Sequence, residues 1–269
     1  NVDNKIPGKD ITEEDLKTKF PLAAKKFKDH KTVVKVNEHE IGGDDLIIFA
    51  GPNTVENREM IIETAQELKN RGAHFLRAGA YKPLTFPYRS PSYFELRENG
   101  IKFLKEAKEL TGINVITEIM HIEKIEEISE VSDILQVGTR NMQNYPLLEA
   151  LGKQSKPVML KRHYGASLRD WLGAAEYILY NGNPNVILCE RGVSVTHTHR
   201  STSRFLLDLQ VIPAARDFTH LPIISDPSHA TFWADWVAPM SYASVGAGVD
   251  GIMIEVHPDP KNAATDPLQ

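Results

Sequence analysis

Six basic side chains follow short apolar runs, at the points where buried strands would end: Arg77, Lys82, Arg140, Lys161, Arg162 and Arg191. A lone cation in such a place is usually solvated or paired with a carboxylate. Six cations on one rim repel one another and lose hydration, so a fold tolerates them when an anion lies between them. Guanidinium groups suit planar oxyanions, and an ammonium acts as a point charge. The pattern predicts a site for a ligand with at least two anionic groups, such as a phosphate and a carboxylate.

A second set of side chains, in the last part of the chain, has the chemistry of a metal site. It comprises His229, Glu255 and Asp266. Taken singly, each of them is as readily a capping or core residue as a ligand. Together on the last strands, one imidazole and two carboxylates would suit a divalent cation. Glu118 and His257 end or follow other strand-like runs and are further polar candidates.

The elements that must position these residues alternate regularly along the chain. Eight β-rich runs are separated by stretches with helical periodicity: residues 46–51, 74–80, 114–119, 133–138, 157–162, 185–191, 222–228 and 251–256. Nearly continuous apolar strands that alternate with helices indicate a parallel sheet buried on both faces. Eight units favour an α/β fold of the (β/α)8 TIM barrel type, whose active site lies at the carboxyl ends of the strands. A doubly wound sheet is the alternative, but "AGPNTVE" is not a glycine-rich dinucleotide loop.

The two ends of the chain depart from the repeating pattern. Residues 1–45 are predicted to form an N-terminal extension, with a helix in 11–30 and a hairpin in 32–43 that could close the bottom of the barrel. The barrel would occupy residues 46–269. The stretch after residue 257 is too short for a loop and a complete eighth helix, so the last helix is expected to be missing or disordered.

Composition excludes several classes of protein. The net charge of −5 over 269 residues gives no reason to expect nucleic acid or an anionic membrane as a partner. The single cysteine, Cys189, lies in an apolar run and excludes a disulfide framework, which fits the cytoplasm. No apolar stretch approaches the ~18 residues of a membrane span.

Seven motifs, taken in order, resemble one enzyme family. They are "AGPNTVE", "LRAGAYKPLT", "VGTRNMQN", "LKR", "NVILCERG", "DPSHA" and "GIMIEVHPDP", and the resemblance runs from about Thr32 to the end. The chain resembles the 3-deoxy-D-arabino-heptulosonate 7-phosphate (DAHP) synthases of type I-beta. Their superfamily also holds the 3-deoxy-octulosonate 8-phosphate (KDO8P) synthases.

The resemblance implies a condensation that feeds the shikimate pathway and aromatic amino acid biosynthesis. C3 of phosphoenolpyruvate (PEP) would attack the aldehyde of erythrose 4-phosphate, water would add at C2, and phosphate would leave. By motif, PEP would be held by Arg77, Lys82, Arg140, Lys161 and Arg191, with Arg162 and Thr85 among the substrate-binding residues. A divalent ion (Mn, Fe, Zn or Co) would bind His229, Glu255 and Asp266. Lys82, Lys161, Asn53, Glu118 and His257 would be the catalytic candidates.

Two residues depart from the family pattern. The metal-dependent members carry cysteine where this chain has Asn53, and an amide oxygen is a much weaker ligand than a thiolate. Some KDO8P synthases carry asparagine there and work without metal, so both metal-assisted and metal-independent catalysis remain open. The acceptor motif "KPRT" is "KPLT" here, so Leu84 replaces the arginine that would hold the acceptor phosphate. Arg89 is a candidate substitute.

Three alternatives to DAHP synthesis remain at this stage. The chain could join PEP to another aldehyde in specialised metabolism, act as a Schiff-base aldolase through Lys161, or bind an anionic metabolite without catalysis. Small-molecule substrates and a homo-oligomer, either a dimer or a tetramer, are the expected partners.

Overall fold

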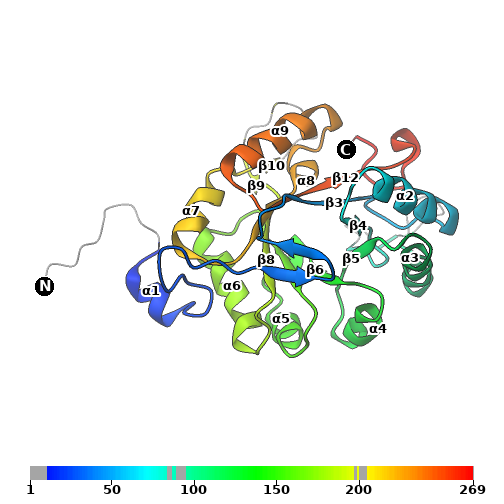
Figure 1. Ribbon diagram of the computed structural model, residues 1–269. Coiled ribbons are helices and arrows are strands. Elements are labelled where there is room, and N and C mark those ends of the chain that lie inside the picture. Colours follow the sequence, from blue (N-terminus) through cyan, green and yellow to red (C-terminus); the bar gives the residue numbers. More distant parts are fainter. Residues whose placement is uncertain (1–10, 84–86, 89–94, 197–198, 200–204, 269) are drawn as a thin grey trace, which may run out of the picture.

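The computed structural model describes residues 11–83, 87–88, 95–196, 199 and 205–268. Its centre is a closed barrel of eight parallel strands, which confirms the predicted fold and excludes the doubly wound sheet (Figure 1). In barrel order these strands are β3 (Ile47–Gly51), β4 (Phe75–Arg77), β5 (Asn114–Glu118), β6 (Ile134–Val137), β7 (Val158–Lys161), β8 (Val186–Glu190), β11 (Ile223–Ser225) and β12 (Gly251–Glu255).

Helices surround the strands (Figure 1). The ring contains α2 (Arg58–Asn70), α3 (Glu98–Thr111), α4 (Ile125–Ser129), α5 (Tyr145–Gly152), α6 (Leu168–Tyr180), α7 (Val211–Phe218) and α9 (Ala234–Ala247). Shorter elements are η1 (Ile122–Lys124), η2 (Thr139–Asn141), α8 (Pro227–Thr231) and the small ribbon of β9 (Val193–Ser194) and β10 (Phe205–Leu206). Between β12 and residue 268 the chain forms only the short turn η3 (Pro260–Asn262) and no eighth barrel helix. No helix in the described part of the chain is long and apolar enough to cross a membrane.

Side chains of each strand alternate between the barrel interior and the layer under the helices. On β7, Met159 belongs to the interior cluster, whereas Val158 and Leu160 pack in the outer one. Cys189 is a buried member of the interior cluster, as its apolar run predicts. Continuing this alternation to the carboxyl ends places one polar side chain of each of seven strands inside the barrel: Arg77, Glu118, Gln136, Lys161, Arg191, Asp226 and Glu255.

The N-terminal segment covers the opposite end of the barrel. The hairpin of β1 (Val34–Val36) and β2 (His39–Ile41) lies across the strands in Figure 1. Its Val34, Val36 and Ile41 belong to the same cluster as the interior residues of the barrel. The predicted helix is shorter than residues 11–30, because α1 covers only Glu13–Thr18. Beyond it, the carboxylate of Glu176 on α6 accepts the backbone N–H groups of the residues after Pro21, in place of helical hydrogen bonds.

Candidate active site

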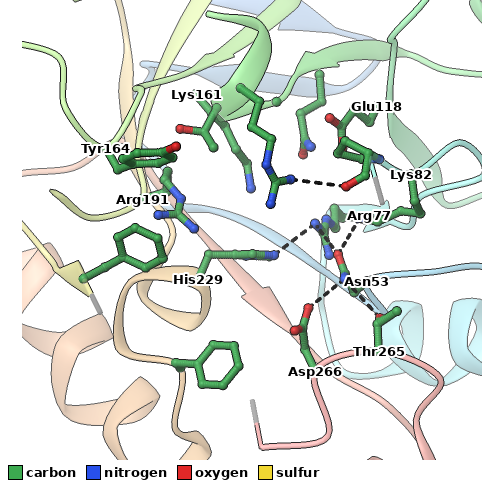
Figure 2. Close-up of a pocket in the computed structure, with 17 residues that line it drawn as sticks. Asn53, Arg77, Lys82, Glu118, Lys161, Tyr164, Arg191, His229, Thr265 and Asp266 are labelled. Atoms are coloured by element: carbon green, nitrogen blue, oxygen red, sulfur yellow. Dashed lines mark hydrogen bonds between the residues drawn. The ribbon is translucent and has the colours of Figure 1, made fainter. Parts of the chain in front are cut away.

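A cavity of about 270 Å³ opens at the carboxyl ends of the strands (Figure 2). Nine of the predicted site residues line it: Asn53, Arg77, Lys82, Glu118, Arg140, Lys161, Arg191, His229 and Asp266. Five of these are basic, so the structure brings most of the predicted cations to one cavity. Thr85, Arg89 and the substituted Leu84 lie outside the described residues.

Arg191 is the cation best placed to meet a free anion. Its side chain is buried, and its guanidinium carbon lies 4.2 Å from the centre of the Phe205 ring. Among the described residues its buried Nη1 has no hydrogen-bond partner. Burial lowers the pKa of Arg191 from its usual value. A desolvated guanidinium with an unused donor is costly unless a ligand accepts from it.

The other cations of the cavity are held by neighbouring oxygens. Lys82 Nζ donates to Asn53 Oδ1 at 2.6 Å, and Arg77 Nη2 donates to the same oxygen at 3.1 Å. Burial and the charge of Arg77 lower the pKa of Lys82 to about 8. Arg140 is exposed at the mouth, where Nη1 donates to the backbone oxygen of Pro83. An anionic ligand would relieve the repulsion between these groups.

Asp226, at the end of β11, connects a lysine and a histidine. Its Oδ2 lies 2.6 Å from Lys161 Nζ and 2.8 Å from His229 Nδ1. Its Oδ1 accepts the backbone N–H of His229 and caps α8. Because Lys161 Nζ is engaged in a buried ion pair with Asp226, the Schiff-base alternative gains no support from this geometry.

His229 is in the form that binds a metal. Burial lowers the pKa of His229 to about 3, so the ring is neutral near neutral pH. Arg77 Nη2 donates to Nε2 at 3.4 Å, so Nε2 carries the lone pair, and the proton of the neutral ring belongs on Nδ1, which lies 2.8 Å from Asp226 Oδ2. Nε2 lies 3.5 Å from Glu255 Oε2. Many metal-binding histidines have a carboxylate beside the ring nitrogen that does not bind the metal.

The three predicted metal ligands lie together. One ligand atom from each of His229, Glu255 and Asp266 falls within 4.8 Å of the others. Glu255 Oε2 is buried without a hydrogen-bond partner among the described residues. Burial raises the pKa of Glu255 to about 8, and the charge of Asp266 adds to the effect. A neutral imidazole beside an unsatisfied carboxylate oxygen fits a divalent cation.

Asn53 occupies the position beside this group of ligands. Its Nδ2 donates to Asp266 Oδ2 at 2.8 Å and to Thr265 Oγ1 at 3.0 Å, while its oxygen faces Lys82 and Arg77 (Figure 2). The Asn53 amide therefore bridges two parts of the site: its oxygen accepts from Lys82 and Arg77, and its nitrogen donates to the predicted ligand Asp266. A thiolate there would turn the same position into a fourth metal ligand.

Among the described residues, three of the predicted site residues do not line the cavity: Glu255, Arg162 and His257. Glu255 still lies against the lining residue His229. Arg162 directly follows the inward Lys161 and therefore points outward, where Nη1 lies 2.8 Å from Glu190 and 2.7 Å from Asp208. The assignment of Arg162 to substrate binding is corrected by this geometry. His257 is not among the lining residues, because its Nε2 lies 3.0 Å from Glu56 and its Nδ1 accepts the backbone N–H of Asp259.

Several lining residues were not predicted: Gln136, Tyr164, Phe205, Phe232 and Thr265. Strand alternation, applied to the run 133–138, would have found Gln136. The three aromatic residues come from a loop, from the two-residue strand β10 and from the end of α8, where periodicity carries no signal. Phe232 has a φ of +63°, which is uncommon for a bulky residue. Residues with such strained backbone conformations cluster at functional sites.

The sequence of residues 25–269 matches the model of the DAHP synthetase I family. The chain belongs to this family. Within the DAHP synthetase I family, it is 40% identical over 250 residues to a phospho-2-dehydro-3-deoxyheptonate aldolase of Thermotoga maritima, covering 93% of this chain and 72% of that protein. A 2-dehydro-3-deoxyphosphooctonate aldolase of Geotalea uraniireducens is 28% identical over 258 residues, with 87% and 89% covered.

Solved structures of the DAHP synthetase I family share the fold. The crystal structure of DAHP synthase from Thermotoga maritima has a TM-score of 0.84 at 40% identity, over 92% of this chain and 70% of that one. A truncated form of the 3-deoxy-D-arabino-heptulosonate 7-phosphate synthase from the same organism gives 0.82 at 38% identity, over 93% and 89%.

Proposed function

We propose that this protein condenses PEP with erythrose 4-phosphate and water to give DAHP and inorganic phosphate. One observation carries the proposal: four buried or part-buried cations surround a single cavity, and the guanidinium of Arg191 has a buried donor without a partner. PEP presents the phosphate and the carboxylate that such a ring would separate. Family membership and the relative that is 40% identical support the same chemistry.

The cations of the cavity would hold PEP by its two anionic groups. Arg191 and Lys161, from neighbouring strands, would bind one anionic group of PEP, and Arg77 with Lys82 would bind the other. Arg140 at the mouth would neutralise remaining charge. C3 of PEP would then form its bond to the aldehyde carbon, the oxygen of water would add at C2, and phosphate would leave. Fixed cations favour this step because they need no rearrangement when phosphate departs.

His229, Glu255 and Asp266 would hold a divalent cation beside the aldehyde. Members of this family generally depend on such a metal. When bound, the cation would polarise the aldehyde carbonyl as a Lewis acid. Manganese, iron, zinc and cobalt all accept this nitrogen and oxygen donor set. The amide of Asn53 turns its Nδ2 toward Asp266 and would add no ligand in this orientation. The homo-oligomer and the cytoplasmic location remain predictions from the sequence.

The direct test is phosphate release from PEP with erythrose 4-phosphate, with and without a strong chelator. Release in both conditions would support the function and make catalysis independent of metal. Release that the chelator removes would support the function with a metal held by the three ligands. If no phosphate appears in either condition, even after Mn, Fe, Zn or Co is added, the proposal of DAHP synthesis is wrong.

Asn53→Cys is expected to raise the affinity for Zn²⁺ or Mn²⁺ because a thiolate replaces an amide next to Asp266. The increase should be about tenfold or more for Zn²⁺, since zinc prefers sulfur, and smaller for Mn²⁺. Calorimetric titration measures both affinities, and Asn53→Ser serves as a control of similar size without a strong ligand. Equal Zn²⁺ affinity in all three proteins would mean that position 53 does not reach the metal.

A second candidate function is the same chemistry with another aldehyde. It is favoured by the aromatic side chains of Tyr164, Phe205 and Phe232, which line the cavity beside the cations. These rings offer apolar contact to an acceptor. A panel of aldehydes, each assayed for phosphate release with PEP, separates this candidate from DAHP synthesis. Turnover of an apolar aldehyde above that of erythrose 4-phosphate would favour it.

A further inference from the structure

The three metal ligands differ in how firmly the fold holds them. Glu255 ends β12, and His229 follows β11 within the short helix α8, so both are attached directly to the barrel. Asp266 lies farther along, in the loop after η3. It has a φ of +51°, a left-handed conformation that is uncommon for residues other than glycine, although aspartate adopts it more readily than most. The position of Asp266 therefore depends on the contacts that the loop makes with the barrel.

Glu56, which follows β3, contacts this loop at two points. Its Oε1 accepts the backbone N–H of Ala264 at 2.7 Å and lies 3.0 Å from His257 Nε2. His257 Nδ1 accepts the backbone N–H of Asp259, so Nε2 must carry the ring proton and donate it to Glu56. One carboxylate oxygen thus ties the beginning of the loop to its end.

The bond to Ala264 lies directly before the residues that meet Asn53. Thr265 Oγ1 and Asp266 Oδ2 both accept from the Asn53 amide, and Thr265 also approaches Thr54. The turn after β3 therefore contacts three consecutive residues of the loop, Ala264, Thr265 and Asp266. Of the residues in this turn, Glu56 is the charged one, and it is part-buried.

We propose that Glu56 is a positioning residue that places Asp266 against His229 and Glu255, and so completes the metal site. The inference rests on the proposed role of Asp266 as a ligand. Glu56 itself does not line the cavity and would not touch substrate. Residues that support metal ligands in this way typically change metal affinity by about 10- to 100-fold when they are replaced.

Three variants and two measurements test the proposal. Glu56→Ala removes both bonds, Glu56→Gln keeps an oxygen that can accept them, and Glu63→Ala removes the same charge from an exposed position on α2. Hydrogen exchange of the segment that contains Ala264 reports on the loop without metal or substrate. Titration with Mn²⁺ alone reports on the ligands.

We expect faster exchange at Ala264 and about 10- to 100-fold weaker Mn²⁺ binding in Glu56→Ala. Glu56→Gln should keep the exchange at Ala264 and the Mn²⁺ affinity close to those of the unaltered protein, and Glu63→Ala should change neither. Unchanged exchange, or unchanged Mn²⁺ affinity despite faster exchange, would overturn the proposal. If Glu56→Ala does not fold, Glu56→Asp, whose shorter side chain cannot span both contacts, takes its place. If the unaltered protein binds no Mn²⁺, the metal part of the proposed function fails, and exchange alone decides whether Glu56 holds the loop.

Discussion

Arg191→Ala is expected to weaken PEP binding by about 100-fold or more. A hydrogen bond to a charged group contributes about 1.5–3 kcal/mol, and a guanidinium can make two to one phosphate or carboxylate. Their loss therefore costs about 3 kcal/mol or more, which is over two orders of magnitude in affinity. Calorimetric titration with PEP measures the effect directly. The PEP affinity of Arg191→Lys should lie between those of the unaltered protein and Arg191→Ala, because lysine keeps the charge but lacks the planar pair of N–H donors.

The same substitution should leave the folded state at least as stable. Arg191 is buried, and its Nη1 has no partner among the described residues, so its removal relieves a desolvated charge. Thermal unfolding should show an unchanged or higher midpoint. Arg71→Ala is a suitable control, since Arg71 pairs with Glu67 between two exposed side chains and does not line the cavity. An unchanged PEP affinity in Arg191→Ala would remove the assignment of this cavity to an anionic substrate.

Asp226→Asn is expected to lower the free energy of unfolding by about 3–5 kcal/mol. Asp226 is completely buried, and its Oδ2 accepts from Lys161 Nζ and lies 2.8 Å from His229 Nδ1. An amide cannot balance the charge of Lys161, and removing one partner of a buried ion pair leaves the other uncompensated. The variant should also lose activity, because the ring of His229 loses the carboxylate that lies against its Nδ1. Urea unfolding followed by fluorescence measures the change.

The adjacent Ser225 provides the matched control for Asp226. It is equally buried, but its Oγ has no hydrogen-bond partner within the described ranges. Ser225→Ala should therefore be neutral or slightly stabilising, because an unsatisfied hydroxyl is removed from the interior. If Asp226→Asn is as stable as the unaltered protein, the ion pair makes no net contribution, as can happen when desolvation equals attraction.

Much of this architecture could be predicted from the sequence because it follows from periodicity. Apolar runs gave the eight strands, and the rule that barrel sites lie at carboxyl strand ends located Arg77, Lys161 and Arg191. The same rule, applied without regard to alternation, also selected Arg162. Lys161 and Arg162 are consecutive, so only one of them can face the interior.

Other features depend on contacts that no local pattern encodes. Tyr164 reaches the cavity from a loop, Phe205 from the two-residue strand β10 and Phe232 from the end of a short helix. His257 follows β12, yet both its ring nitrogens are engaged by Glu56 and Asp259. Asp226 could have been recognised as an inward residue, but its double partnership with Lys161 and His229 required the assembled barrel.

The outward pairing of Arg162 with Glu190 has a consequence for how this protein can be altered. At the carboxyl ends of β7 and β8, the residues that line the cavity, Lys161 and Arg191, alternate with Arg162 and Glu190, which pair with each other outside the barrel. A library for new acceptor specificity should vary the inward positions and the aromatic residues that line the cavity. It should keep Arg162, Glu190 and Asp208 constant, so that the ion pairs that stabilise the strand ends stay intact. Randomising whole strand ends would mix the two kinds of position, and most of its members would be lost to misfolding before their activity could be selected.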